Sequence, residues 1–116
     1  MKSIQPKITL DEFQQTLHHP TPPAGLPPLL AALWWERKGD WSRGHEIAQR
    51  PQGQDEQERD ESSAMAAWVH AYLHRKEGDD ANAGYWYGQA RRTASTLPLD
   101  EEWKEIVTAL LDVSGA

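Results

Sequence analysis

Apolar side chains recur at helical spacing along most of the chain. The clearest pattern lies near the C-terminus, where Trp103, Ile106, Val107, Leu110 and Leu111 are spaced i, i+3, i+4, i+7 and i+8. Residues at this spacing share one face of a helix. No segment keeps the alternation of apolar and polar residues that is typical of a half-buried strand. The sequence therefore predicts an all-α fold.

Capping residues, prolines and glycines mark the expected helix boundaries. Thr9 precedes Glu12 at capping-box spacing, and Pro28 suits the first turn of a helix. Gly39 and Gly78 are placed to end helices, and the aspartate after each is an N-cap candidate. These signals predict about six helices, near residues 9–18, 28–38, 41–50, 62–77, 80–92 and 100–113.

Two segments lack helical patterning. Residues 19–28 hold five of the eight prolines, and we expect them to run extended over the surface because proline blocks helix. Residues 51–61 carry no apolar side chain. We expect them to form a solvated loop, or in part the polar lead-in to the next helix.

The chain contains an internal repeat at an offset of 39 residues. The aligned pairs are Gly39 and Gly78, Asp40 and Asp79, Ala32 and Ala71, Gly44 and Ala83, and Trp35 and His74. Small residues thus recur where two helix backbones would approach, and a turn this short requires antiparallel packing. A single domain of two helical hairpins is predicted, at about 27–50 and 62–92, with the C-terminal helix at about 100–113.

This repeat resembles the tetratricopeptide and Sel1-like helical hairpin repeats. The second copy matches at Ala71, Gly78, Asp79, Ala83, Tyr87 and Ala90, and the first at Ala32, Trp35, Gly39, Asp40, Trp41 and Gly44. The first copy departs from the pattern at Pro51, where alanine is expected. Residues 68–87 also resemble small uncharacterised bacterial proteins. The repeat resemblance implies right-handed stacked hairpins, flanked by N- and C-terminal capping helices, with a concave face that binds peptides or proteins.

Charge and composition narrow the classes of partner. The formal net charge is −6, with 18 acidic and 12 basic residues. No run of Lys or Arg suggests a phosphate-binding face, so nucleic acid and anionic membrane are not expected as partners. The absence of cysteine excludes disulfides, thiolate catalysis and cysteine-based zinc sites. No stretch has the pattern of a signal peptide or a membrane span, and we expect a cytoplasmic protein.

Histidines occupy positions where the repeat pattern has apolar bulk. His70 and His74 are four residues apart, so they share a helix face. His45, with Glu46 beside it, is expected to lie across from them, and three imidazoles with a carboxylate suit a divalent transition metal. Two alternatives remain. The imidazoles could be buried hydrogen-bonding groups whose partners are Tyr72, Tyr85, Tyr87, an indole N–H or a backbone carbonyl, or they could line a ligand pocket.

Two functions follow from these features. The first is a module that binds a peptide, a protein or a second copy of the chain on a concave surface of the second and fourth helices. Its candidate binding residues are Trp35, His45, His70, His74, Arg75, Trp86 and Tyr87. The alternative is a small metal-dependent or histidine-based enzyme centred on His45, His70 and His74. No nucleophile has an evident base, so we assign no catalytic residue and expect no cofactor other than a metal ion.

Overall fold

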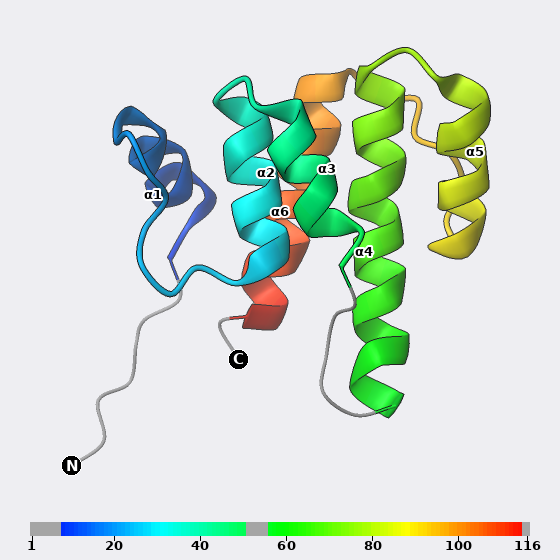
Figure 1. Cartoon of the computed structure of the whole chain (residues 1–116), viewed down its shortest axis with the longest axis horizontal. Helices are drawn as coiled ribbons and strands as arrows, with labels where there is room; N and C mark the ends of the chain where they lie inside the picture. Colours follow the sequence, from blue (N-terminus) through cyan, green and yellow to red (C-terminus); the bar gives the residue numbers. More distant parts are fainter. Residues whose placement is uncertain (1–7, 51–55, 115–116) are drawn as a thin grey trace.

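The described part of the chain is entirely helical. The computed structural model describes residues 8–50 and 56–114. They form the helices α1 Leu10–Gln15, α2 Pro28–Arg37, α3 Trp41–Ala48, α4 Glu56–Lys76, α5 Asp80–Gln89 and α6 Leu99–Ser114, with a 3₁₀ turn at Thr16–His18. These residues contain no strand, and the all-α prediction is confirmed (Figure 1). None of the described helices is long and apolar enough to cross a bilayer.

The two predicted hairpins, α2–α3 and α4–α5, have turns of the same geometry. Gly39 and Gly78 adopt φ values of 97° and 91°, in the left-handed region that favours glycine. The Asp40 carboxylate accepts a hydrogen bond from the Arg43 N–H at 3.0 Å, and the Asp79 carboxylate accepts one from the Asn82 N–H at 3.2 Å. Each aspartate therefore caps the helix that follows it.

Small residues let the two helices of each hairpin approach closely. In the first hairpin, a Cβ atom added to Gly44 would lie 2.7 Å from the carbonyl oxygen of Ala32, which is backbone and cannot rotate away. In the second, Ala71 and Ala83 are both buried. The repeat alignment therefore identified the close approach in the first hairpin and two buried small residues at the equivalent positions of the second.

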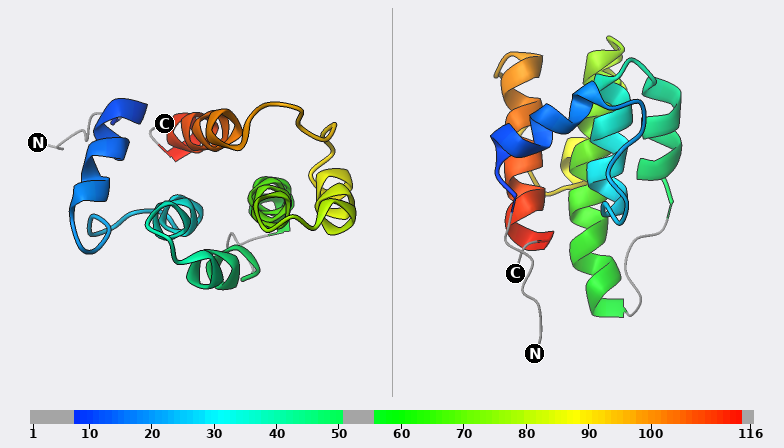
Figure 2. Two further views of the ribbon diagram at one scale, coloured as in Figure 1. Left: turned by 90° about the horizontal axis from the view of Figure 1, so that it is seen from above. Right: turned by 90° about the vertical axis from the view of Figure 1, so that its left-hand side faces the viewer.

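Helix α6 lies across both hairpins. Figure 2 shows α2 and α4 between α6 on one side and α3 on the other. Trp103, Ile106 and Val107 of α6 are fully buried. The Trp103 indole N–H donates to the carbonyl of Leu33 at 3.2 Å, and the Arg37 guanidinium lies 4.0 Å from the centre of the Trp103 ring. The C-terminal helix therefore closes the core along the inner faces of α2 and α4.

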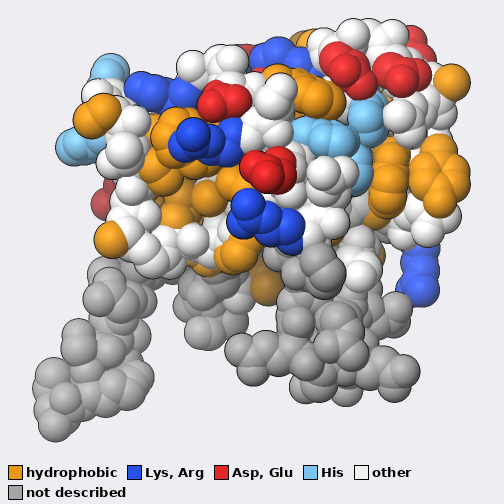
Figure 3. Space-filling model, viewed as in Figure 1, with side chains coloured by type: hydrophobic (Ala, Val, Ile, Leu, Met, Phe, Trp, Pro, Cys, Tyr) orange, Lys and Arg blue, Asp and Glu red, His pale blue; other side chains and the backbone are white. Residues whose placement is uncertain are grey.

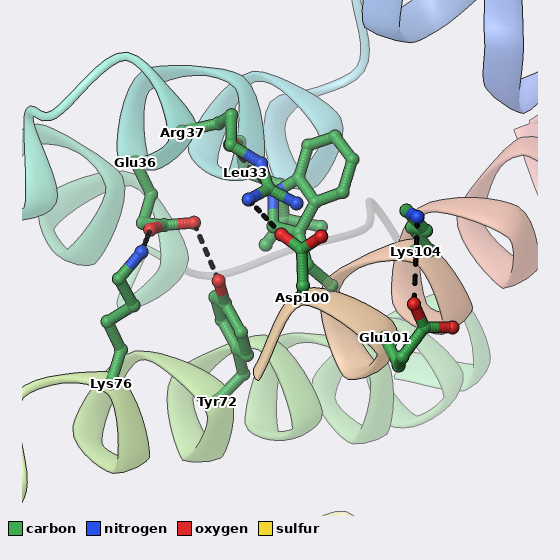
Figure 4. A network of polar contacts seen from close by, with 9 residues as sticks. Leu33, Glu36, Arg37, Tyr72, Lys76, Asp100, Glu101 and Lys104 are labelled. Atoms are coloured by element: carbon green, nitrogen blue, oxygen red, sulfur yellow. Dashed lines mark hydrogen bonds and ion pairs between the residues drawn. The ribbon is translucent and has the colours of Figure 1, made fainter. Parts of the chain in front are cut away.

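Two buried glutamates link these helices. Glu36 of α2 accepts hydrogen bonds from the Tyr72 hydroxyl at 3.0 Å and from Lys76 at 2.7 Å, as Figure 4 shows. Burial and the neighbouring Glu36 carboxylate raise the pKa of Tyr72. Glu102 of α6 accepts hydrogen bonds from three side chains, Trp68, Arg75 and Tyr87, at 3.2, 2.8 and 2.5 Å. Each buried carboxylate thus has a cation and a tyrosine hydroxyl as partners, as burial of a charge requires.

Helix boundaries differ from the prediction at α4 and α5. Helix α4 begins at Glu56 rather than at residue 62, so the predicted loop 51–61 is wrong over residues 56–61. These residues form the polar lead-in to the helix, because glutamate, glutamine and arginine are good helix formers; residues 51–55 lie outside the described part. Helix α5 ends at Gln89 rather than 92, and Arg91 beyond it has a left-handed φ of 60°.

Candidate metal centre

Three histidines from two helices meet on the side of α4 that faces away from α6. His45 lies on α3, while His70 and His74 lie one turn apart on α4. Figure 3 shows histidine side chains gathered over α3 and α4, next to hydrophobic side chains over α5. His70 and His74 are buried, with 6% and 7% of their surface exposed, whereas His45 is partly exposed. We call these three residues the histidine cluster.

The nitrogens of the histidine cluster converge. One ring nitrogen from each histidine lies within 4.8 Å of the others. Nε2 of His45 and Nε2 of His70 are 2.8 Å apart, a hydrogen-bond distance. Since one of these atoms must donate and the other accept, at least one of the two rings presents a lone pair to its neighbour.

Tryptophans hold two of the imidazoles in place. The His70 ring lies between Trp86 of α5 and His74, with ring centroids 4.0 and 4.9 Å away and nearly parallel planes. The His45 ring stacks on Trp41 at 4.8 Å. Trp41 is itself fixed, because its indole N–H donates to the Leu73 carbonyl at 2.7 Å. The cluster is therefore oriented by packing from α3, α4 and α5 together.

Burial favours the neutral form of two of these imidazoles. Burial, and then the neighbouring His45 and His74, lower the pKa of His70 to about 4. The pKa of His45 is also lowered, first by burial and then by His74, while Glu77 acts in the opposite direction. At neutral pH both rings are uncharged, which is the form in which imidazole binds metal ions.

Glu77 is a member of the site that the sequence analysis missed. Its carboxylate lies 2.6 Å from Nδ1 of His74. A carboxylate on the second nitrogen of a metal-binding histidine is a common arrangement that fixes the tautomer and the ring orientation. The sequence did contain a signal for it: Glu77 follows His74 by three residues, a spacing that places two side chains on the same face of a helix. Glu46, the carboxylate that we expected here, is exposed and lies 3.9 Å from Arg50.

The tyrosine partners considered for the histidines are wrong. The Tyr72 hydroxyl donates to Glu36 and the Tyr87 hydroxyl to Glu102, on the α6 side of the hairpins. The Tyr85 side chain is 59% exposed. The imidazoles contact one another, the two tryptophans and Glu77 instead, so the cluster is a separate group and not an extension of the tyrosine network.

The seven candidate binding residues separate into three groups. His45, His70, His74 and Trp86 come together in the cluster. Trp35 lies against Trp34 and Arg43 in the first hairpin. Arg75 and Tyr87 face the other side, where both bind Glu102 of α6.

The concave surface expected on the second and fourth helices is not open. Helix α6 packs on α2 and α4, and its Trp103 and Glu102 side chains are fully buried there. Binding of an external peptide stays a prediction, but the inner faces of these two helices are already covered by the chain itself.

Comparison with protein-family models, with curated proteins and with solved structures gave no match. The chemistry of the site is therefore argued from its residues. The three imidazoles offer neutral nitrogen ligands. A carboxylate lies on the second nitrogen of one imidazole, and two indoles stack on the cluster and make its surroundings largely apolar. Such a donor set suits first-row divalent ions such as zinc, nickel and copper.

Proposed function

We propose that this protein binds a divalent transition-metal ion, with zinc as the reference ion, through His45, His70 and His74. The observation that carries the proposal is the convergence of the three ring nitrogens, all within 4.8 Å of one another. Two of the ligands come from one turn of α4 and the third from α3, so an ion would join two helices of different hairpins. The Glu77 carboxylate supports the same role, because it orients His74 from outside the ligand set.

The nitrogens, which lie within 4.8 Å of one another, would have to move to reach the spacing of a tetrahedral zinc site. Zinc binds imidazole at about 2.0–2.1 Å, so two nitrogens of a tetrahedral site lie roughly 3.3 Å apart. The His45 and His70 nitrogens, at 2.8 Å, would separate slightly as their hydrogen bond is replaced by bonds to the ion. His45 is the partly exposed member of the cluster, and its side chain has the most room to move.

Three protein ligands leave one position of a tetrahedral ion open. Structural zinc sites are closed by four protein ligands, whereas sites that act on a bound molecule keep a position for water or substrate. We therefore assign the ion a role in binding a small molecule and not only in holding the helices together. This metal-dependent function takes the place of the concave-face peptide module, since α6 covers that face.

Metal binding is tested on protein produced without an affinity tag. The protein is stripped with a chelator, dialysed against zinc and analysed for bound metal, and cobalt is used as a spectroscopic substitute. We expect one ion per chain, with an affinity that falls about 100-fold or more in His45→Gln, His70→Gln and His74→Gln, beyond the 10–100-fold typical of an outer-shell partner.

The matched control is the double variant His18→Gln, His19→Gln, since both of these histidines are exposed and lie outside the cluster. It should bind zinc as the unchanged protein does. Zinc uptake that survives all three cluster variants, or that is lost in the control, would contradict the proposal.

A further inference from the structure

Helix α5 supplies none of the three proposed metal ligands, yet one of its side chains contacts a ligand directly. The indole of Trp86 lies on the imidazole of His70, with ring centroids 4.0 Å apart and an angle of 6° between the two planes. The imidazole of His74 stacks on the same ring at 4.9 Å. A displacement of α5 would therefore remove one of the two aromatic rings that stack on His70 and restrain its plane.

Helix α5 is weakly held by its own sequence. It has ten residues, fewer than an isolated helix needs to be stable in water, and it packs on α4 at the edge of the molecule (Figure 2). It also contains two exposed glycines, Gly84 and Gly88, and glycine destabilises a helix. Its large buried side chain is Tyr87. Beside Tyr87, the half-buried Trp86 is the large side chain through which α5 packs on the protein.

An ion in the histidine cluster would strengthen the contact between Trp86 and His70. In the metal-free protein at neutral pH, the His70 imidazole is uncharged. A divalent ion bound to that ring would withdraw electrons from it and make it partly positive. The face of an indole attracts positive charge more strongly than any other aromatic side chain does. The occupied site would therefore hold the indole, and with it α5, more firmly than the metal-free site does.

Helix α3 offers an internal comparison. It carries the ligand His45, so a bound ion would hold α3 directly. Its tryptophan, Trp41, stacks on His45 at 4.8 Å and is also fixed by the hydrogen bond from its indole N–H to the Leu73 carbonyl at 2.7 Å. An effect of the ion on α5 has a different route, because the contact of α5 with the cluster is the stack of Trp86 on His70.

We propose that Trp86 is a positioning residue of the metal site and that metal binding, through Trp86, holds α5 on α4. This inference rests on the proposed metal site. The coupling acts in both directions, because two linked equilibria affect each other by the same factor. Trp86 raises the affinity for the ion as much as the ion stabilises the packed position of α5.

Hydrogen–deuterium exchange of the full-length, tag-free protein, with and without zinc, tests this coupling. The backbone amides of α5 should exchange about fivefold more slowly in the zinc-loaded protein, the effect of one cation–π contact. In Trp86→Leu, zinc should no longer slow exchange in α5. It should still slow exchange in α3, because His45 is bound to the ion in this variant too.

Zinc affinity gives the reciprocal measurement. Trp86→Leu should bind zinc about fivefold more weakly, by the same factor as the slowing of exchange in α5. Trp86→Phe, which keeps an aromatic face on His70, should recover most of the lost affinity, whereas leucine fills space without offering such a face. Trp35→Leu is the matched control, at a half-buried tryptophan of the first hairpin that contacts Arg43. It should leave both zinc affinity and α5 exchange unchanged.

The outcomes separate this inference from the metal site. Zinc uptake that leaves exchange in α5 of the unchanged protein unaltered overturns the coupling alone, and this measurement needs no variant to fold. Equal zinc affinities of Trp86→Leu and the unchanged protein overturn it as well. A protein that takes up no zinc overturns the metal site and this inference together.

Discussion

The two hairpins have turns of the same geometry but carry different side chains on the face that points away from α6. At the positions of His70 and His74, the first hairpin has Ala31 and Trp35, and Trp35 is covered by the guanidinium of Arg43 at 4.2 Å. The second hairpin has the imidazoles of His70 and His74, which stack on each other, and His70 also stacks on Trp86. The comparison indicates that the repeat supplies the scaffold and that the substitutions on one face supply the chemistry.

The hairpins also differ in how their buried charges are satisfied. Glu36 of the first hairpin reaches Lys76, whose side chain is 39% exposed. Arg75 of the second hairpin is bound to Glu102, whose side chain is fully buried. Glu102 therefore joins the second hairpin to α6, whereas Glu36 joins the two hairpins to each other. The variants that follow test these differences in order of expected effect.

Glu102→Ala should have the largest effect. It removes a fully buried carboxylate that accepts hydrogen bonds from Trp68, Arg75 and Tyr87, which should lower the free energy of unfolding by about 3–5 kcal/mol. Glu36→Ala should lower the free energy of unfolding by less, because its partner Lys76 can turn toward water. Urea denaturation of both variants measures the two values. Equal losses would contradict the difference between the hairpins.

Acidification should destabilise the metal-free protein through His70. Its pKa is about 4 in the folded chain, against an ordinary value of 6.5. Above pH 6.5 the ring is neutral in both states; as the pH falls toward 4, the unfolded chain binds a proton that the folded chain does not, so stability decreases. The decrease in the free energy of unfolding should reach about 3 kcal/mol near pH 4.

Denaturation of His70→Gln beside the unchanged protein isolates this contribution from those of other groups, including the neighbouring His45 and His74. The difference in the free energy of unfolding between the two proteins should be constant above pH 6.5 and should change below it. A difference that is constant from pH 7 to pH 4 would show that the His70 pKa is not lowered. His18→Gln, at an exposed histidine, is the control.

Glu77→Gln should weaken zinc binding by about 10–100-fold, because the outer-shell carboxylate on His74 is lost. The matched control is Glu46→Gln, at the exposed carboxylate beside His45, which should leave the affinity unchanged. Competition with a chromophoric chelator measures both. If Glu46→Gln had the larger effect, the assignment of the carboxylate would be reversed.

Gly44→Ala should destabilise the first hairpin by about 1–3 kcal/mol, because the added Cβ would meet the Ala32 backbone and force α2 and α3 apart. The corresponding helix of the second hairpin contains Gly84, where an added Cβ meets nothing within 4 Å. Gly84→Ala should raise stability by about 0.5–1 kcal/mol, because alanine is the better helix former. Thermal denaturation of the two variants should show shifts of opposite sign.

The sequence contained most of the hairpin geometry. Gly39 and Gly78 could be recognised because a left-handed residue ends a helix, and the aspartates after them cap the next one. The cluster was also predicted in outline, since His70 and His74 share a face. These features depend on local geometry and on a repeat that a single sequence displays.

The pattern of apolar and polar residues did not show which helices pack against one another. The amphipathic face of α6 shows that it is buried, but not that it covers α2 and α4. Glu102 has the same appearance as the other acidic residues in the first turn of α6 and is nonetheless fully buried. Glu46 and Glu77 are each close in sequence to a cluster histidine, and only side-chain direction in the folded chain distinguishes them.

The central claim is that three imidazoles hold one ion. X-ray absorption spectroscopy of the zinc-loaded protein measures it directly, because the spectrum reports the number and distance of the ligands. We expect three imidazole nitrogens at about 2.0–2.1 Å and one further light atom. Fewer than three imidazoles around the ion, or an unchanged spectrum in His74→Gln, would contradict the account.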